Sequence, residues 1–199
     1  MKPILSLVLL LTVFCATAQK PTDLDKSPMD MSYMPNGYPL LKRAGKAKAL
    51  PVARVLYGRP LKNGRLIFGG LNKYGELWRL GANEATEIEF FSNVRFGGKF
   101  IPKGRYTMYC IPEESKWTLI INKDNYSWGS FIYDAKKDLV RVEADVTRNT
   151  EPAEAFTIYF EDTRNGANMV FVWDDVKVSV PVTEAGNETP APVKNPKKG

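Results

Sequence analysis

The chain has 199 residues, of which 44% are hydrophobic, with 28 Lys and Arg against 22 Asp and Glu and no histidine. The absence of histidine excludes Ser-His-Asp and Cys-His catalysis, and it excludes zinc sites that use imidazole. The positive residues behind the net charge of +6 gather in residues 42–48 and 194–198. No helix-turn-helix, RNP or basic-zipper pattern accompanies these runs, so no nucleic-acid partner is predicted.

The first eighteen residues have the pattern of a secretory signal peptide. Lys2 precedes an apolar run from Ile4 to Ala16, and Ala16-Thr17-Ala18 is a small-x-small cleavage site. The apolar run is roughly 13 residues long, against the roughly 20 that cross a bilayer. The sequence therefore predicts a soluble exported protein, periplasmic or extracellular, that is cleaved after Ala18 and has no transmembrane segment in the mature chain.

Removal of this peptide leaves Cys110 as the only cysteine of the mature chain. An internal disulfide is then impossible, and so is a Cys-x-x-Cys redox pair. Cys110 lies in an alternating apolar stretch, which favours a small buried core residue over a reactive thiol.

The distribution of prolines and apolar residues divides the mature chain into three parts. Residues 19–50 are rich in proline and basic residues and are expected to form an extended N-terminal lead-in, with Met29 to Met34 a candidate strap across the domain surface. Residues 51–182 carry the strand pattern of a β-sandwich domain. Residues 183–199 combine prolines with small and charged residues and are predicted to be a disordered tail.

The domain is predicted to contain three hairpins, each formed by two alternating stretches around turn residues. They join residues 53–57 to 65–68, 94–96 to 99–101 through Gly97-Gly98, and 105–111 to 117–123.

The later strands show which side chains face the core. Residues 140–147 alternate between Val or Ala and polar side chains, and residues 156–160 and 176–180 repeat the scheme. Turns are predicted at Asn165-Gly166 and Asp174-Asp175. One buried and one solvated face per strand, with no amphipathic helix, predicts an all-β fold of about nine or ten strands. We expect an antiparallel, jelly-roll-like β-sandwich rather than a closed barrel.

Several motifs together resemble one family of exported proteins, the family "domain of unknown function 2911". The motifs are Arg54-Val55-Leu56-Tyr57-Gly58-Arg59-Pro60, Gly64-Arg65-Leu66-Ile67-Phe68-Gly69, Trp78-Arg79-Leu80-Gly81-Ala82-Asn83-Glu84-Ala85-Thr86, Pro102-Lys103-Gly104-Arg105-Tyr106, and Trp128-Gly129 with Tyr133-Asp134. The resemblance spans roughly Ser27 to Val182 and departs from the family at Asn72-Lys73, where members often have Val-Pro. It implies a β-rich exported domain and supplies no activity.

The segment Trp78–Thr86 is the candidate site, because it gathers polar side chains directly before an alternating strand. In a ligand-binding interpretation, Arg79, Asn83 and Glu84 contact a polar ligand on a stacking tryptophan. The candidate ligand-binding residues are Trp78, Arg79, Asn83, Glu84, Thr86, Trp128 and Tyr133. In the alternative interpretation, Arg79 pairs with Glu84 across a turn and the tryptophans belong to the core.

Three functional hypotheses follow from these residues. The first is a non-catalytic module at the cell envelope that binds a carbohydrate- or peptide-like ligand. The second is a structural protein that meets an envelope protein partner through an exposed sheet edge or apolar patch. The third is a hydrolase that pairs Glu84 with Glu87, Asp134 or Asp174. No catalytic residue is assigned, no cofactor is predicted, and the absence of an oxygen-rich loop of EF-hand spacing predicts no metal site.

Overall fold

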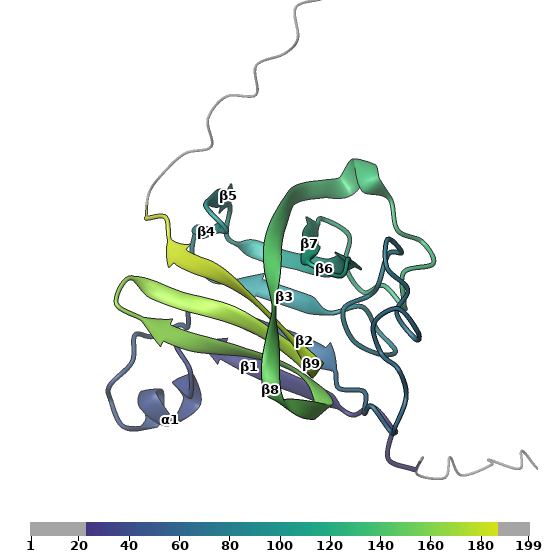
Figure 1. Cartoon of the computed structure of the whole chain (residues 1–199). Coiled ribbons are helices and arrows are strands. Elements are labelled where there is room, and N and C mark those ends of the chain that lie inside the picture. The colour runs from purple at the N-terminus through teal and green to yellow at the C-terminus, as the bar shows by residue number, and fades with distance from the viewer. Residues whose placement is uncertain (1–22, 187–199) are drawn as a thin grey trace, which may run out of the picture.

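The computed structural model describes residues 23–186, in which nine strands, one short α-helix and one 3-10 turn are present (Figure 1). The strands are β1 (Met29–Met34), β2 (Ala53–Gly58), β3 (Glu87–Phe90), β4 (Val94–Phe96), β5 (Lys99–Ile101), β6 (Gly104–Pro112), β7 (Lys116–Asn122), β8 (Asp138–Thr163) and β9 (Gly166–Glu184), with α1 at Tyr38–Arg43 and η1 at Ala135–Lys137. The predicted signal peptide and most of the predicted C-terminal tail lie outside the described residues.

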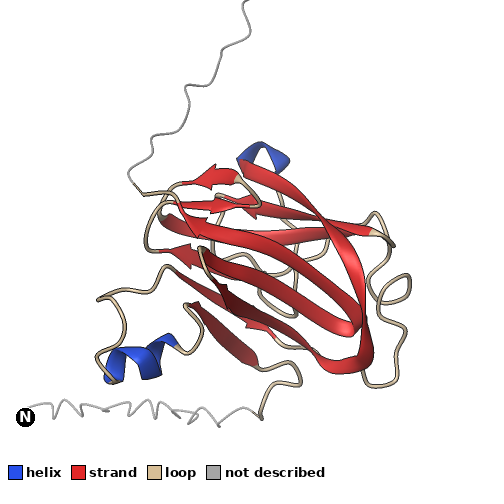
Figure 2. Ribbon diagram, turned by 60° about the vertical axis from the view of Figure 1, so that its left-hand side comes forward, coloured by secondary structure: helices blue, strands red, loops and turns tan. Residues whose placement is uncertain are grey.

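The nine strands form one antiparallel sheet in the order β1-β2-β3-β6-β7-β8-β9-β4-β5. The 26-residue strand β8 joins its two parts, because residues 138–145 pair with β7 and residues 146–163 pair with β9. Figure 1 shows β8 bending as it passes from one part to the other, and Figure 2 shows how strands dominate the molecule. The predicted all-β, antiparallel, single-domain fold is confirmed. The two packed parts of the fold belong to one continuous open sheet, which bends at β8 so that one part lies over the other.

One hydrophobic core fills the space between the two parts of the sheet. It takes the inward side chains of β2, β3, β6 and β7 from one part and those of β8 and β9 from the other. The predicted alternation is confirmed, because Phe156, Ile158 and Phe160 are buried while their neighbours are more exposed. Cys110 is fully buried in this core, and burial raises the pKa of its thiol well above the usual value.

Aromatic rings form the centre of this core, and Trp78 contacts most of them. Its ring centroid lies 5.0 Å from that of Phe156, 5.8 Å from Trp117, 5.9 Å from Trp173 and 6.0 Å from Phe68. The contacts come from both parts of the sheet and from the loop after β2. Trp78 therefore joins the elements that surround the candidate site.

Three of the predicted strand connections are confirmed. β4 and β5 pair across Gly97-Gly98, β6 pairs with β7, and β8 turns into β9 at residues 163–166. Gly97 and Gly98 both have positive φ, of 55° and 79°, which a tight two-residue turn requires.

The predicted hairpin between residues 53–57 and 65–68 is wrong. β2 has β1 on one edge and β3 on the other, so neither edge is free for residues 65–68. These residues instead form a compact loop, in which the N–H groups of Leu71 and Asn72 donate to the carbonyls of Leu66 and Ile67.

The part of residues 19–50 that the structure describes contains regular elements as well as extended chain. β1 pairs with β2 from Met29 opposite Gly58 to Met34 opposite Ala53, so this stretch is an edge strand of the sheet. α1 follows, with a proline in its first turn and Tyr38 buried. Within residues 23–186, no helix is long and apolar enough to span a membrane.

Replacement of Trp78 by Ala tests the role of this side chain in the core. Because Trp78 is 6% exposed and packs against four aromatic rings, we expect the free energy of unfolding to fall by about 3–5 kcal/mol. Trp128→Ala is the matched control, since Trp128 is 59% exposed, and its effect should stay within about 0.5 kcal/mol. Urea unfolding followed by circular dichroism measures both. Equal losses in the two variants would contradict this assignment of the core.

Candidate functional site

The segment Trp78–Thr86 is an irregular loop that its own hydrogen bonds hold in place. Trp78 is anchored to β6 by two backbone hydrogen bonds with Cys110, of 2.7 and 2.9 Å. Its indole Nε1 donates to the Gly81 carbonyl at 3.1 Å. The buried Thr86 hydroxyl donates to the Leu80 carbonyl, so the structure gives Thr86 an internal role in the loop.

Close backbone contact fixes this loop against β2. A side chain at Gly58 would place its Cβ 2.2 Å from the Ala82 carbonyl oxygen, and one at Gly81 would come 2.9 Å from the Gly58 carbonyl oxygen. Only glycine permits such an approach at both positions. Leu80 and Asn83 have positive φ, of 56° and 60°, and turn the chain between Arg79 and Glu84.

Arg79 and Asn83 line one cavity of about 250 Å³, which we call the arginine pocket. Its polar lining includes Arg65 and Asn72 from the loop after β2, and Trp78 and Trp173 border it. No aspartate or glutamate of residues 23–186 lines this pocket. Two arginines therefore line a cavity whose side-chain lining has no negative charge.

The loop that carries Arg65 is attached to β8 and β9. The Phe156 N–H donates to the Pro60 carbonyl at 2.9 Å, and the Lys62 N–H donates to the Glu154 carbonyl at 2.7 Å. The Arg65 guanidinium donates through Nε to the Lys62 carbonyl at 2.9 Å and through Nη2 to the Leu61 carbonyl. These acceptors are neutral, so they orient the guanidinium without neutralising its charge.

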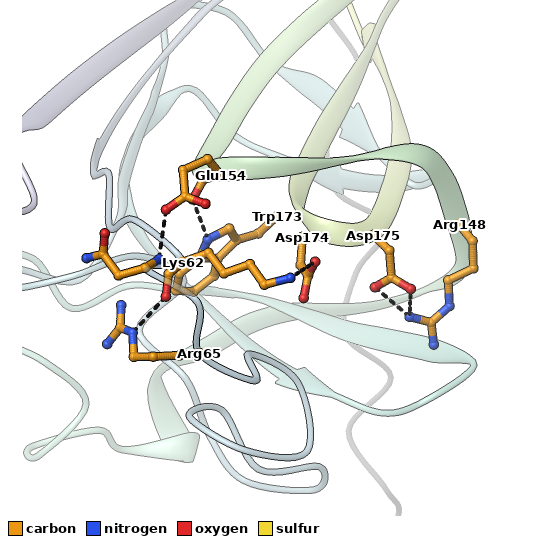
Figure 3. A network of polar contacts seen from close by, with 8 residues as sticks. Lys62, Arg65, Arg148, Glu154, Trp173, Asp174 and Asp175 are labelled. Atoms are coloured by element: carbon orange, nitrogen blue, oxygen red, sulfur yellow. Dashed lines mark hydrogen bonds and ion pairs between the residues drawn. The ribbon is translucent and has the colours of Figure 1, made fainter.

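The acidic side chains near this loop already have partners (Figure 3). Lys62 forms an ion pair with Asp174, and both oxygens of Asp175 accept from Arg148 at 2.9 Å. The Glu154 carboxylate accepts from the Asn63 N–H at 2.7 Å. In the part of the chain that the structure describes, no carboxylate forms an ion pair with Arg65 or Arg79.

The predicted turn at Asp174-Asp175 is wrong, because β9 continues through both residues. The irregularity there is local: Asp174 has a φ of 54°, and the register with β8 shifts between Arg148 and Thr157. Two acidic residues next to each other resembled a turn in the sequence, but their ion pairs attach β9 to its neighbours.

Arg79 is the least compensated charge of the arginine pocket. Its side chain is half-buried, and its buried Nε has no hydrogen-bond partner. Burial lowers the pKa of this guanidinium from its usual value. The Nδ2 of Asn72 is also buried without a partner. Two residues that line the pocket therefore carry buried donors without acceptors. Both residues also line a neighbouring cavity of about 150 Å³, whose lining includes Glu76.

Glu84 and Trp128 belong to a second cavity, of about 440 Å³, which we call the aromatic pocket. The two residues form an isolated β-bridge, and the Ala85 N–H donates to the Ser127 carbonyl at 2.9 Å. Glu87 and Tyr126 also line this pocket. Among the described residues, no ion pair joins Glu84 to Arg79, and the two side chains serve different cavities.

Tyr133 lines neither pocket and belongs to a separate polar network. Its hydroxyl donates to Asp138 Oδ2 at 2.7 Å and accepts from Arg141 Nη2 at 2.8 Å, and its ring packs on Tyr109. Burial, followed by the hydrogen bond to Asp138, raises the pKa of Tyr133 from 10.0 to about 12.

The structure therefore divides the seven candidate residues among four places. Trp78, Arg79 and Asn83 line the arginine pocket, Glu84 and Trp128 line the aromatic pocket, Thr86 closes the loop and Tyr133 lies apart. The sequence did not single out Arg65, Asn72 or Tyr126 as site residues. The nearest available signal was the resemblance, whose second motif contains Arg65. No cluster of three or more His, Cys, Asp or Glu able to hold a metal ion occurs within residues 23–186.

Fold and site together define an all-β domain with two ligand-sized cavities around one irregular loop. Residues 43–182, more than half of the chain, match the family described as "Protein of unknown function (DUF2911)", and the chain belongs to this family. Searches of curated proteins and of solved structures gave no significant match. The matched range includes every residue singled out in the arginine pocket.

The raised pKa of Tyr133 predicts a loss of stability at high pH. An unfolded tyrosine titrates near pH 10, whereas Tyr133 titrates at about 12 in the folded protein. Between these values the unfolded state loses the proton first, so the free energy of unfolding falls as pH rises. Tyr133→Phe should make this fall shallower between pH 10 and 12.

Urea unfolding at a series of pH values from 9 to 12 measures the effect. Tyr74→Phe is the control, because Tyr74 is exposed, and it should keep the wild-type steepness. An unchanged slope for Tyr133→Phe would show that the hydroxyl network does not resist deprotonation.

Proposed function

We propose that this protein is a non-catalytic binding module of the cell envelope, and that it holds the carboxylate of a carbohydrate- or peptide-like ligand in the arginine pocket. The observation that carries the proposal is the pair Arg65 and Arg79, which line one cavity without an acidic partner among the described residues. Guanidinium groups bind carboxylates through paired hydrogen bonds of fixed geometry.

The half-buried charge of Arg79 supports an anionic ligand. Removal of a charge from water costs free energy unless a counter-charge or hydrogen bonds compensate it. Here the buried Nε donates to nothing and burial lowers the pKa of the group. A carboxylate in the pocket supplies both the counter-charge and the missing acceptor.

The size and the neutral donors of the pocket support part of a larger ligand. At about 250 Å³, the cavity is smaller than the roughly 300–1,000 Å³ that encloses a complete drug-sized molecule. It fits one acidic sugar ring or one carboxyl-terminal residue. The amides of Asn72 and Asn83 are suited to hydroxyl or peptide groups of such a ligand.

Binding fits the arrangement of carboxylates better than hydrolysis does. Asp134 accepts from the Lys136 N–H at the start of η1, and Asp174 is paired with Lys62. Glu84 and Glu87 share the aromatic pocket, but a general acid of glycoside hydrolysis is normally a desolvated carboxyl group. Glu84 is exposed and Glu87 is only half-buried, so neither is fully desolvated.

A second candidate function, contact with an envelope protein, is favoured by the loop before η1. Tyr126, Trp128, Phe131 and Ile132 are all exposed, with Phe131 at 83%. Four large apolar side chains within seven positions form the kind of surface that partner proteins cover.

The envelope location rests on the predicted signal peptide. We expect the mature protein to be recovered from the periplasmic or extracellular fraction with Gln19 as its first residue. Cell fractionation followed by intact-mass analysis measures this. A cytoplasmic protein that retains residues 1–18 would contradict the location and leave the arginine pocket to be tested on its own.

Thermal-shift measurements with matched acidic and neutral ligands test the binding proposal. Glucuronate, and a dipeptide with a free carboxyl end, should raise the melting temperature, because a ligand that binds only the folded state stabilises it by about 2.7 kcal/mol at 100 times its Kd. Glucose and the amidated dipeptide should not. Arg79→Met should abolish the shift while keeping or raising the stability of the free protein, since it removes a half-buried charge without a partner.

Arg164→Met is the charge-matched control, because Arg164 is exposed in the turn between β8 and β9. This variant should retain the wild-type response. The proposal is wrong if neither acidic ligand shifts the wild type, or if Arg79→Met responds as the wild type does.

A further inference from the structure

The aromatic pocket has a composition that differs from that of the arginine pocket, and the two share no lining residue. It lies between β1, β2, the start of β3 and the loop at residues 126–128, and at about 440 Å³ it is the larger of the two. Met29, Leu56 and Ala85 give it an apolar lining. A ligand in this cavity is therefore recognised independently of a carboxylate in the arginine pocket.

Two aromatic side chains at this pocket remain open to solvent. Trp128 is 59% exposed and Tyr126 is 77% exposed. The backbone holds both in place, because Glu84 forms a β-bridge with Trp128 and the Tyr126 N–H donates to Glu87 Oε1 at 2.9 Å. The backbone of both residues is thus fixed. The Trp128 ring surface is available for contact, whereas the Arg105 guanidinium already lies over the Tyr126 ring.

The charge at this pocket is negative in an otherwise basic protein. Glu84 and Glu87 line it, and no lysine or arginine of the described chain does. Glu89, on the same strand as Glu87, has Arg54 as its partner at 2.7 Å. Within residues 23–186, neither Glu84 nor Glu87 forms an ion pair, and the hydrogen bond that Glu87 Oε1 accepts from the Tyr126 N–H comes from a neutral donor.

Arg105 shows that Tyr126 is already suited to a cation. The Arg105 guanidinium lies 5.6 Å from the centroid of the Tyr126 ring and donates to the Tyr126 hydroxyl at 2.8 Å. It does not line the aromatic pocket. Arg105 Nη2 lies 4.0 Å from Glu89 Oε2, so among the described residues its ion-pair partner is outside the pocket.

From this geometry we propose that the aromatic pocket binds an organic ammonium group. Ring faces attract cations through their quadrupole, and recognition of ammonium groups by aromatic side chains is an established use of that attraction. Glu84 supplies the counter-charge at the rim, Glu87 supplies it from a half-buried position, and Trp128 supplies the ring surface. A neutral sugar would also stack on Trp128, but it would gain nothing from the two negative charges.

Tryptophan fluorescence provides a direct measurement, because Trp128 is the exposed member of the four tryptophans while Trp78, Trp117 and Trp173 are buried. The intact mature protein is titrated with choline, with n-butylammonium, and with 3,3-dimethylbutan-1-ol, which is the neutral isostere of choline. We expect a saturable change with the ammonium compounds and none with the isostere. The choline and n-butylammonium arms distinguish a quaternary from a primary ammonium source.

Glu84→Gln should weaken binding of the ammonium probe about tenfold, in line with loss of one charge contact worth about 1.4 kcal/mol. Glu114→Gln is the control, because Glu114 is also exposed but lies in the loop between β6 and β7. It should bind as the wild type does. Trp128→Ala should abolish binding in isothermal titration calorimetry while its melting temperature stays near that of the wild type.

Three results would each overturn the proposal. One is equal binding of the neutral isostere, and another is equal affinity in Glu84→Gln. The third is a saturable response to glucose that Glu84→Gln leaves unchanged, which would assign the pocket to neutral carbohydrate. Each result is independent of the response to glucuronate, so failure here is distinguishable from failure of the arginine pocket.

Discussion

The burial of Trp78 is the constraint on which the candidate site depends. Its indole packs against rings from both parts of the folded sheet and from the loop after β2, and its backbone is paired with Cys110 on β6. Because Trp78 is held in this way, the backbone of the adjacent Arg79 has little freedom to move. Arg79 follows Trp78 directly and lines the arginine pocket beside the loop that carries Arg65, as well as a neighbouring cavity of about 150 Å³.

The backbone between Arg79 and Glu84 then separates opposite charges. Leu80 and Asn83 adopt the left-handed conformation, and Gly58 and Gly81 let the loop lie directly on β2. The result is that this loop of nine residues places Arg79 at one cavity and Glu84 at another. An internal ion pair would have cancelled both charges. Their separation leaves each available to a ligand of opposite sign.

The acidic side chains around the arginine pocket are also kept from neutralising its arginines. Asp174, Asp175 and Glu154 lie near the Arg65 loop, but Lys62, Arg148 and the Asn63 N–H already engage them (Figure 3). The acidic groups hold β8, β9 and the loop together and do not neutralise the pocket. Structural ion pairs thus lie next to a cavity whose arginines they leave unpaired.

Patterns confined to neighbouring residues predicted the fold well. Alternation and turn glycines were sufficient for the β4–β5 hairpin and for the faces of β8, because strands joined by short turns have few other partners. The predicted hairpin at residues 65–68 failed because strands from other segments of the chain pair with β2. β1, which comes from the segment expected to be an extended lead-in, occupies one edge of β2, and β3 occupies the other.

The candidate site was predicted only in part, again because some of its residues come from distant segments of the chain. Trp78, Arg79 and Asn83 are close in sequence and line one pocket, whereas Arg65, Asn72 and Tyr126 reach the two cavities from other segments. The division between Arg79 and Glu84 depends on a left-handed leucine, a conformation that sequence does not predict for this residue type. Asn72 adds a buried amide without a hydrogen-bond partner to the residues that line the arginine pocket.

The central claim is that one loop presents two independent cavities of opposite charge. Nuclear magnetic resonance tests it most directly, by following the Arg79 Nε–Hε signal and the Trp128 indole N–H signal in the same sample. Glucuronate should shift the Arg79 signal and leave Trp128 unchanged, and choline should do the reverse. If one ligand shifted both signals, or if neither ligand shifted its own, the account of two charge-separated sites would be contradicted.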